Sequence, residues 1–210
     1  MVHSILLARL CPEVARVVVS TDSDEIAAAA RAYDAEVPFN RPVELAQDET
    51  PMWPVVRHAL AALDPEGAEY DGLLLLQPTS PGRLPEDVAG AAALLSERRD
   101  ADGVIGVSEP HFNPIWTAVV DRGGFLADLV PGGAAYGRRQ DVPRVLRING
   151  SLYLWRSALV REREVDPRGS ARFLGWEIPE RRAVDIDTAD DLELAELLVQ
   201  AGQLRLPWLR

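Results

Sequence analysis

Residues 73–83 read LLLLQPTSPGR, an apolar run that stops at a polar turn bracketed by prolines. The turn carries hydrogen-bonding side chains at Gln77, Thr79, Ser80 and Arg83. A short apolar run bounded by turn residues is typical of a buried strand. In open α/β sheets, ligands bind outside the carboxyl ends of the strands. The stretch therefore predicts both a buried strand and a ligand site at its end.

Outward from this stretch, predicted strands and helices alternate along the chain. The strands, which are short apolar and β-branched runs, are expected at 16–20, 36–39, 73–77, 103–108 and 147–155. The helices, marked by capping residues and apolar spacing, are expected at 4–10, 24–33, 51–63, 85–98 and 188–200. This alternation predicts an α/β fold with a doubly wound, mostly parallel sheet. The length of 210 residues fits one domain, residues 1–210.

The pattern changes between residues 113 and 143. Residues 116–120 and 125–129 flank the sequence Asp121-Arg122-Gly123-Gly124. A glycine pair between two apolar runs indicates a β-hairpin. We therefore expect a small antiparallel excursion from the main sheet.

Composition excludes several classes of protein. Asp and Glu total 33 against 22 Arg, with no Lys, which gives a net charge of -11. General nucleic-acid binding is therefore not expected, because it requires a basic face. Cys11 is the single cysteine, which favours a reducing compartment. Because no run approaches the ~20 apolar residues of a membrane span, and the N-terminus lacks a signal-peptide pattern, we expect a cytoplasmic protein without a membrane contact.

Residues 184–191 read VDIDTADD and carry two carboxylates with a spacing of two. If residues 184–187 form a strand, Asp185 and Asp187 project from the same face. Two adjacent carboxylates repel each other unless a cation joins them, and a hard divalent ion such as Mg²⁺ prefers oxygen ligands. The alternative is that Asp187 caps the following helix and that Asp185 is a solvated strand end.

Two arginine-containing segments form the main local concentration of positive charge. They read Arg138-Arg139-Gln140 and Arg147-Ile148-Asn149-Gly150. The planar guanidinium of arginine suits carboxylates and phosphates. The segments are thus candidates for binding an anion, and the alternative is a solvated loop with a surface ion pair.

Six motifs resemble, in order, those of the acylneuraminate cytidylyltransferases, the CMP-sialic acid synthetase family. They are VVVSTDSDEIA at 17–27, VPFNRPVELAQDET at 37–50, LLQPTSPGR at 75–83, HFNPIW at 111–116, RRQDVPRVLRINGSLYL at 138–154 and VDIDTADDLELAE at 184–196. Each motif is weakly specific alone, but the six follow in the same order and spacing along nearly the whole chain, which makes the resemblance specific. The resemblance implies a Rossmann-like nucleotidyltransferase fold in which residues 116–147 form a dimerisation arm, so a homodimer is expected.

The resemblance also implies a reaction and a set of residues. CMP would pass from CTP to an acidic nine-carbon sugar of the sialic, legionaminic or pseudaminic type, with release of pyrophosphate. Position by position, it implies that Asp185 and Asp187 bind Mg²⁺ and act in catalysis with Gln77, and that Arg41 and Thr50 bind the nucleotide. The residues implied for the sugar are Gln77, Arg139, Arg147, Asn149, Tyr153 and Phe173, with Arg139 suited to the sugar carboxylate.

One departure from the family pattern leaves alternatives open. The family begins with a strand and a loop that cradles the CTP phosphates, and the resemblance here begins after both. A strand lost from inside the sheet would leave unpaired backbone and an unfilled core slot. Either the working protein is longer, or the chain is a catalytically inactive relative that acts as a binding or dimer-partner protein. A related nucleotidyltransferase or glycosyltransferase, with Asp185 and Asp187 as its metal pair, is a third possibility.

Overall fold

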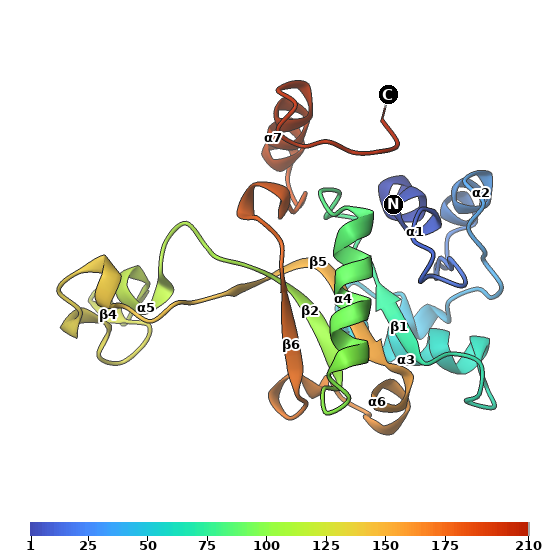
Figure 1. Ribbon diagram of the computed structural model, residues 1–210, viewed down its shortest axis with the longest axis horizontal. Helices are drawn as coiled ribbons and strands as arrows, with labels where there is room; N and C mark the ends of the chain where they lie inside the picture. The colour runs from blue at the N-terminus through green and yellow to red at the C-terminus, as the bar shows by residue number, and fades with distance from the viewer. Residues whose placement is uncertain (210) are drawn as a thin grey trace.

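A computed structural model describes residues 1–209, and Figure 1 shows a central sheet with helices on both faces and an arm at one side. The α-helices are α1 (Val2–Arg9), α2 (Asp24–Ala32), α3 (Met52–Leu63), α4 (Pro85–Glu97), α5 (Pro114–Thr117), α6 (Ser157–Glu162) and α7 (Ala189–Gln200). The strands are β1 (Gly72–Leu75), β2 (Gly103–Ser108), β3 (Val119–Asp121), β4 (Leu126–Asp128), β5 (Arg147–Arg156) and β6 (Phe173–Glu177). Short 3-10 helices are η1 (Val43–Leu45), η2 (Gly133–Ala135), η3 (Arg139–Asp141), η4 (Pro167–Gly169) and η5 (Glu180–Arg182).

The main sheet has the order β1-β5-β2-β6. Strand β5 is antiparallel to both β1 and β2, while β2 and β6 are parallel. Three strands therefore run in one direction and β5 opposes them, which confirms the expected mostly parallel α/β sheet. Strand β6 was not expected from the sequence.

The two strands expected before residue 40 are shorter than predicted. Val18 and Glu36 form an isolated parallel bridge, with the Val19 amide donating to the Glu36 carbonyl at 2.9 Å and the Glu36 amide to the Val17 carbonyl at 2.8 Å. Within residues 1–209 neither segment hydrogen-bonds to the main sheet as a strand. The backbone of residues 17–19 is thus hydrogen-bonded on one side only. This single bridge is too short to form a strand of the sheet.

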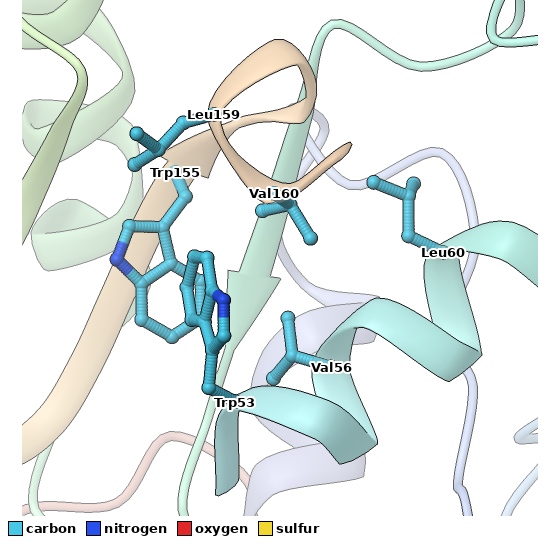
Figure 2. Close-up of a cluster of buried hydrophobic side chains, with 6 residues drawn as sticks. All are labelled: Trp53, Val56, Leu60, Trp155, Leu159 and Val160. Atoms are coloured by element: carbon cyan, nitrogen blue, oxygen red, sulfur yellow. The ribbon is translucent and has the colours of Figure 1, made fainter. Parts of the chain in front are cut away.

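Alternating side chains of β5 divide the core into two layers. Leu152 faces α4 and packs with Ala91 and Leu95. Trp155 faces α3 and α6, in the cluster of Figure 2. That cluster consists of Trp53, Val56, Leu60, Trp155, Leu159 and Val160. Each large apolar side chain buried there contributes about 1.5–3 kcal/mol relative to exposure, so the two layers fix the sheet between its helices.

A buried ion pair joins α4 to the segment after β6. Arg182 donates to both carboxylate oxygens of Asp87, at 2.6 and 3.0 Å. The Trp176 indole donates to the same carboxylate at 3.2 Å, and the Leu84 amide donates at 2.7 Å, which caps α4. The Asp87 side chain is 3% exposed and that of Arg182 is 15% exposed. A single carboxylate therefore ties a helix start, a strand and a 3-10 helix together.

The arm contains α5, the hairpin of β3 and β4, and η2, and it projects from the body at the left of Figure 1. The predicted hairpin is confirmed for residues 119–128, while residues 116 and 117 belong to α5. Arg144 pairs with Glu109 at 3.0 Å and with Glu177 at 2.6 Å, which ties the returning chain at the base of the arm to the sheet. Among residues 1–209, no helix is long and apolar enough to cross a membrane.

Candidate functional site

The polar residues of the turn after β1 meet strand β5 at Gly150. The φ of Gly150 is +73°, a conformation that favours glycine. A Cβ atom at this position would collide with Gln77 Oε1 and lie 3.4 Å from Ser80 Oγ and 3.6 Å from Asp185 Oδ2. The absence of a side chain at Gly150 therefore lets three oxygen-bearing side chains from two distant segments converge on one point.

The segment with the two carboxylates is held against the same turn. The Ile186 amide donates to the Thr79 carbonyl at 2.8 Å, and Ser80 Oγ donates to Asp185 Oδ1 at 3.3 Å. The expected strand over residues 184–187 is wrong, because this segment pairs with the turn and not with a neighbouring strand. Asp187 is exposed on the same segment. It is not the helix cap either, since Thr188 caps α7.

A buried arginine lies behind this turn. The Arg83 guanidinium donates to the Ser151 carbonyl at 2.5 Å, to the Gln77 carbonyl at 2.9 Å and to the Ser4 hydroxyl. Arg83 is 1% exposed. Burial lowers the pKa of Arg83 to about 9, although the charges of Asp87 and Asp185 oppose the shift. Arg83 therefore joins the backbone of the turn after β1, at Gln77, to the backbone of β5 at Ser151, next to Gly150.

A cavity of about 320 Å³ opens beside Gln77 on the α3 face of the sheet. It is lined by Pro51, Met52, Trp53, Leu75, Gln77, Ile105, Tyr153, Trp155, Asp166, Arg168 and Phe173. The rings of Tyr153 and Trp155 stack with centroids 5.4 Å apart. The volume of the cavity is at the lower end of the ~300–1,000 Å³ typical of small-molecule sites. The cavity, named here the aromatic cavity, holds three of the predicted site residues: Gln77, Tyr153 and Phe173.

The pKa of the Tyr153 hydroxyl responds to burial and to three charged residues. Burial raises the pKa of Tyr153 above its ordinary value, the positive charge of Arg168 lowers it, and the charges of Asp185 and Asp166 raise it further. The charge of Asp185, which lies beside Gly150, therefore acts on a side chain that lines the aromatic cavity.

Arg147 and Asn149 have protein partners close to the site. Arg147 Nε donates to Glu180 at 3.0 Å, and a terminal nitrogen donates to the Ala183 carbonyl at 3.1 Å. The Asn149 amide, which is 2% exposed, donates to Ser108 Oγ at 2.9 Å and accepts from the Ser151 amide at 3.0 Å. Arg147 ties β5 to the segment that leads to Asp185, and Asn149 ties β5 to the end of β2. Neither side chain lines the aromatic cavity.

Three further predicted residues, Arg139, Arg41 and Thr50, also lie outside the aromatic cavity. Arg139 begins η3 and lines a different cavity of about 170 Å³ with Glu109 and Arg144. Arg41 binds the chain two residues after the Val18 bridge, where its guanidinium donates to both the hydroxyl and the carbonyl of Ser20. Thr50 lies just before α3, and its amide donates to the Gln47 carbonyl at 3.0 Å. The structure therefore does not place Arg139 beside Gln77 and Tyr153 within one copy.

Sequence reasoning missed three features of the site. Asp166 caps η4 and Arg168 lies within it, and both line the aromatic cavity. The Asp-Pro pair signals a short helical turn but not which part of the fold that turn contacts. The motif at residues 138–154 contains Gly150, but its pattern does not indicate that other side chains converge there. The one available signal was an Asn-Gly pair inside an otherwise apolar strand, which often marks a close approach of other groups.

No model of a known protein family matches the chain. Curated relatives do match over nearly its full length. The chain is 30% identical to CMP-N,N'-diacetyllegionaminic acid synthase of Legionella pneumophila over 96% of its own residues and 85% of that protein. It is 28% identical to the post-translational flagellin modification protein B of Campylobacter coli, over 97% of this chain and 85% of that protein.

The fold is also similar to that of solved cytidylyltransferases. CMP:2-keto-3-deoxy-manno-octonic acid synthetase in complex with CTP matches 95% of this chain and 87% of that chain, with a TM-score of 0.68 and 16% identity. 4-Diphosphocytidyl-2C-methyl-D-erythritol synthase from Anaerococcus prevotii matches with a TM-score of 0.66 and 16% identity, over 95% of this chain and 88% of that chain. These structures support the α/β nucleotidyltransferase fold.

Proposed function

Because the chain belongs to the family of cytidylyltransferases that includes the CMP-nonulosonic acid synthases, we propose that it transfers CMP from CTP to an acidic nine-carbon sugar. A sugar hydroxyl attacks the α-phosphorus of CTP, the new oxygen–phosphorus bond forms, and the bond to the leaving pyrophosphate breaks as the hydroxyl proton departs. The observation that carries the proposal is the convergence of Gln77, Ser80 and Asp185 on Gly150, beside the aromatic cavity. Cytoplasm, where CTP is available, is the location that goes with this reaction.

The two substrates would occupy neighbouring regions. We assign the sugar to the aromatic cavity with Gln77, Tyr153 and Phe173, and the nucleotide to the side of Arg41 and Thr50. The argument for the second assignment is that residues 40–50 run directly into α3, whose first residues Met52 and Trp53 line the aromatic cavity. The α-phosphate would then lie between the two regions, near Asp185.

The donor set suits Mg²⁺. Carboxylate and hydroxyl oxygens are hard ligands, and Mg²⁺ in nucleotide sites typically binds one or two carboxylates plus substrate phosphates. Asp185 and Asp187 would hold the ion, with Ser80 orienting Asp185 through its hydrogen bond. Among residues 1–209 no group of three or more His, Cys, Asp and Glu forms a metal cluster, so a two-carboxylate site shared with phosphate fits this chain. The ion would neutralise charge on the transferring phosphate.

The arm supports a homodimer. Phe125 is 81% exposed and Leu126 is 75% exposed, and Val119, Leu129 and Trp116 add further apolar surface. Exposed apolar patches of this kind mark interaction sites. A second copy packed against the arm would bury them.

Aspartate in place of both Phe125 and Leu126 is expected to convert the dimer to a monomer. Each large apolar side chain contributes about 1.5–3 kcal/mol when it is buried, and a carboxylate in the same place opposes burial. Sedimentation velocity measures the outcome. Val165→Asp is the matched control, because Val165 is 76% exposed but lies outside the arm, and it should leave the dimer intact. A wild-type protein that sediments as a monomer at micromolar concentration refutes the dimer.

Pyrophosphate release tests the function directly. The protein is incubated with Mg²⁺, CTP and sialic, legionaminic or pseudaminic acid in turn. Turnover with at least one acid is expected, and CTP should be preferred over UTP and GTP. Absence of turnover, with binding of an acid retained, favours a catalytically inactive binding protein, and equal use of UTP favours a different nucleotidyltransferase.

A further inference from the structure

We propose that Arg168 binds the carboxylate of the acidic sugar in the aromatic cavity and so selects acidic over neutral sugars. This inference rests on the proposed function and concerns the substrate class of the same site. It differs from the assignment of the carboxylate to Arg139, which the sequence motifs imply.

Charge in the aromatic cavity is distributed unevenly. Arg168 is the single cation among the lining residues, and Asp166 is the single carboxylate. The other lining residues are apolar except for Gln77 and the Tyr153 hydroxyl. A sugar carboxylate that enters this cavity loses water, and burying a charge without a partner is costly. The guanidinium of Arg168 is the group in the cavity that can compensate that cost.

The Arg168 guanidinium is available for a ligand. Its contact with Asp166 is 3.7 Å, beyond hydrogen-bond distance, and its side chain is 64% exposed at the mouth of the cavity. Within residues 1–209 the guanidinium donates no hydrogen bond to the protein. Arginine presents paired donors that match a carboxylate in a bidentate geometry. The Asp166 carboxylate lies within ion-pair distance of this guanidinium but accepts no hydrogen bond from it.

The backbone that carries Arg168 is fixed. The Asp166 carboxylate accepts a hydrogen bond from the Arg168 amide at 2.9 Å. The fully buried Pro167 anchors the next position, and its carbonyl accepts from the amides of Ser170 and Ala171, both at 2.8 Å. A fixed backbone limits the entropy lost when the side chain closes on a ligand. The loop is thus built to present this side chain.

The position of Arg168 also links it to the reacting groups. Its positive charge acts on the Tyr153 hydroxyl together with the charges of Asp185 and Asp166. Arg168 and Tyr153 both line the aromatic cavity, so a carboxylate bound by Arg168 would lie in the same cavity as the Tyr153 hydroxyl. Arg139, in contrast, lines a separate cavity at the base of the arm.

The test compares single variants in sugar binding and in turnover. Arg168→Gln is expected to raise both the calorimetric Kd and the KM for the acid sugar about threefold to fivefold, because the 64% exposed guanidinium stays partly solvated and an exposed ion pair contributes modestly. The KM for CTP should stay near wild type. The sugar Kd and KM of Arg168→Lys should lie between those of the wild type and of Arg168→Gln, because lysine keeps the positive charge but lacks the paired donors of the guanidinium. Arg163→Gln, an exposed arginine of the same connection that does not line the cavity, is the matched control and should match wild type.

The outcomes separate this inference from the proposed function. Sugar binding by the wild type that weakens in Arg168→Gln supports the inference, even if no acid is turned over. Wild-type turnover with an unchanged Kd and KM for the sugar in Arg168→Gln overturns the inference and leaves the function standing. Weakening in Arg139→Gln but not in Arg168→Gln also overturns it. If the wild type binds none of the three acids, the inference falls together with the function.

Discussion

Asparagine in place of Asp185 is expected to lower kcat/KM for CTP by about a hundredfold or more. Asparagine keeps the size of the side chain and an oxygen that accepts from Ser80, whose hydroxyl is 3.3 Å from Asp185 Oδ1. It removes the negative charge that would hold Mg²⁺. A metal ion stabilises transition-state charge by several kcal/mol, and each 1.36 kcal/mol corresponds to a factor of ten in rate. Initial rates of pyrophosphate release at several Mg²⁺ concentrations measure the loss, and the variant should also require more Mg²⁺.

The control for this variant is Asp190→Asn. Asp190 is an exposed carboxylate in the first turn of α7, on the same acidic segment. Its replacement removes the same charge five residues away in sequence and should leave the rate within about twofold, as most surface substitutions do. An Asp185→Asn enzyme that retains wild-type activity at limiting Mg²⁺ contradicts the role assigned to Asp185.

Strand β1 was predictable because its sequence signal is local. Four leucines, three of which lie in β1, are followed by a proline-bracketed polar turn, and this local pattern predicts both the strand and the candidate site beside it. Capping signals likewise located α2 and α7, where Ser23 and Thr188 accept hydrogen bonds from amides in the first turn. Each of these features depends on a few consecutive residues, so the sequence carries all the information needed.

Other features of the site depend on long-range packing. The strand expected at Asp185 is replaced by an irregular segment, because the Ile186 amide binds the turn at Thr79 instead of a neighbouring strand. Strand β6 lacked a continuous apolar run, since Leu174 and Trp176 face α4 while Gly175 lies between them. No local pattern reports which distant carbonyl will meet a given amide. Arg168 was missed for the same reason, because only the folded chain brings η4 to the aromatic cavity.

Alanine in place of Asp87 is expected to lower the free energy of unfolding by about 3–5 kcal/mol. Removing one partner of a buried ion pair leaves the other charge without compensation, and the Arg182 side chain is only 15% exposed. The same change removes the acceptor for the Trp176 indole and for the Leu84 amide. Since domains of this kind are stable by about 5–15 kcal/mol, the loss is a large fraction of the total. Equilibrium urea unfolding followed by tryptophan fluorescence measures it.

Two further variants compare how much a buried ion pair and an exposed ion pair contribute to the free energy of unfolding. Arg182→Gln should lose less stability than Asp87→Ala, because Asp87 then keeps the donors from Trp176 and Leu84. Asp100→Ala is the exposed counterpart. Like Asp87, Asp100 forms ion pairs with arginine, here Arg98 and Arg172, but these pairs lie on the exposed surface. Exposed pairs contribute little to stability because water solvates the separated charges, so the urea midpoint of Asp100→Ala should stay close to that of the wild type. Equal losses in Asp87→Ala and Asp100→Ala would show that burial of the Asp87 pair does not stabilise this fold, and that α4 is held to the sheet by apolar packing alone.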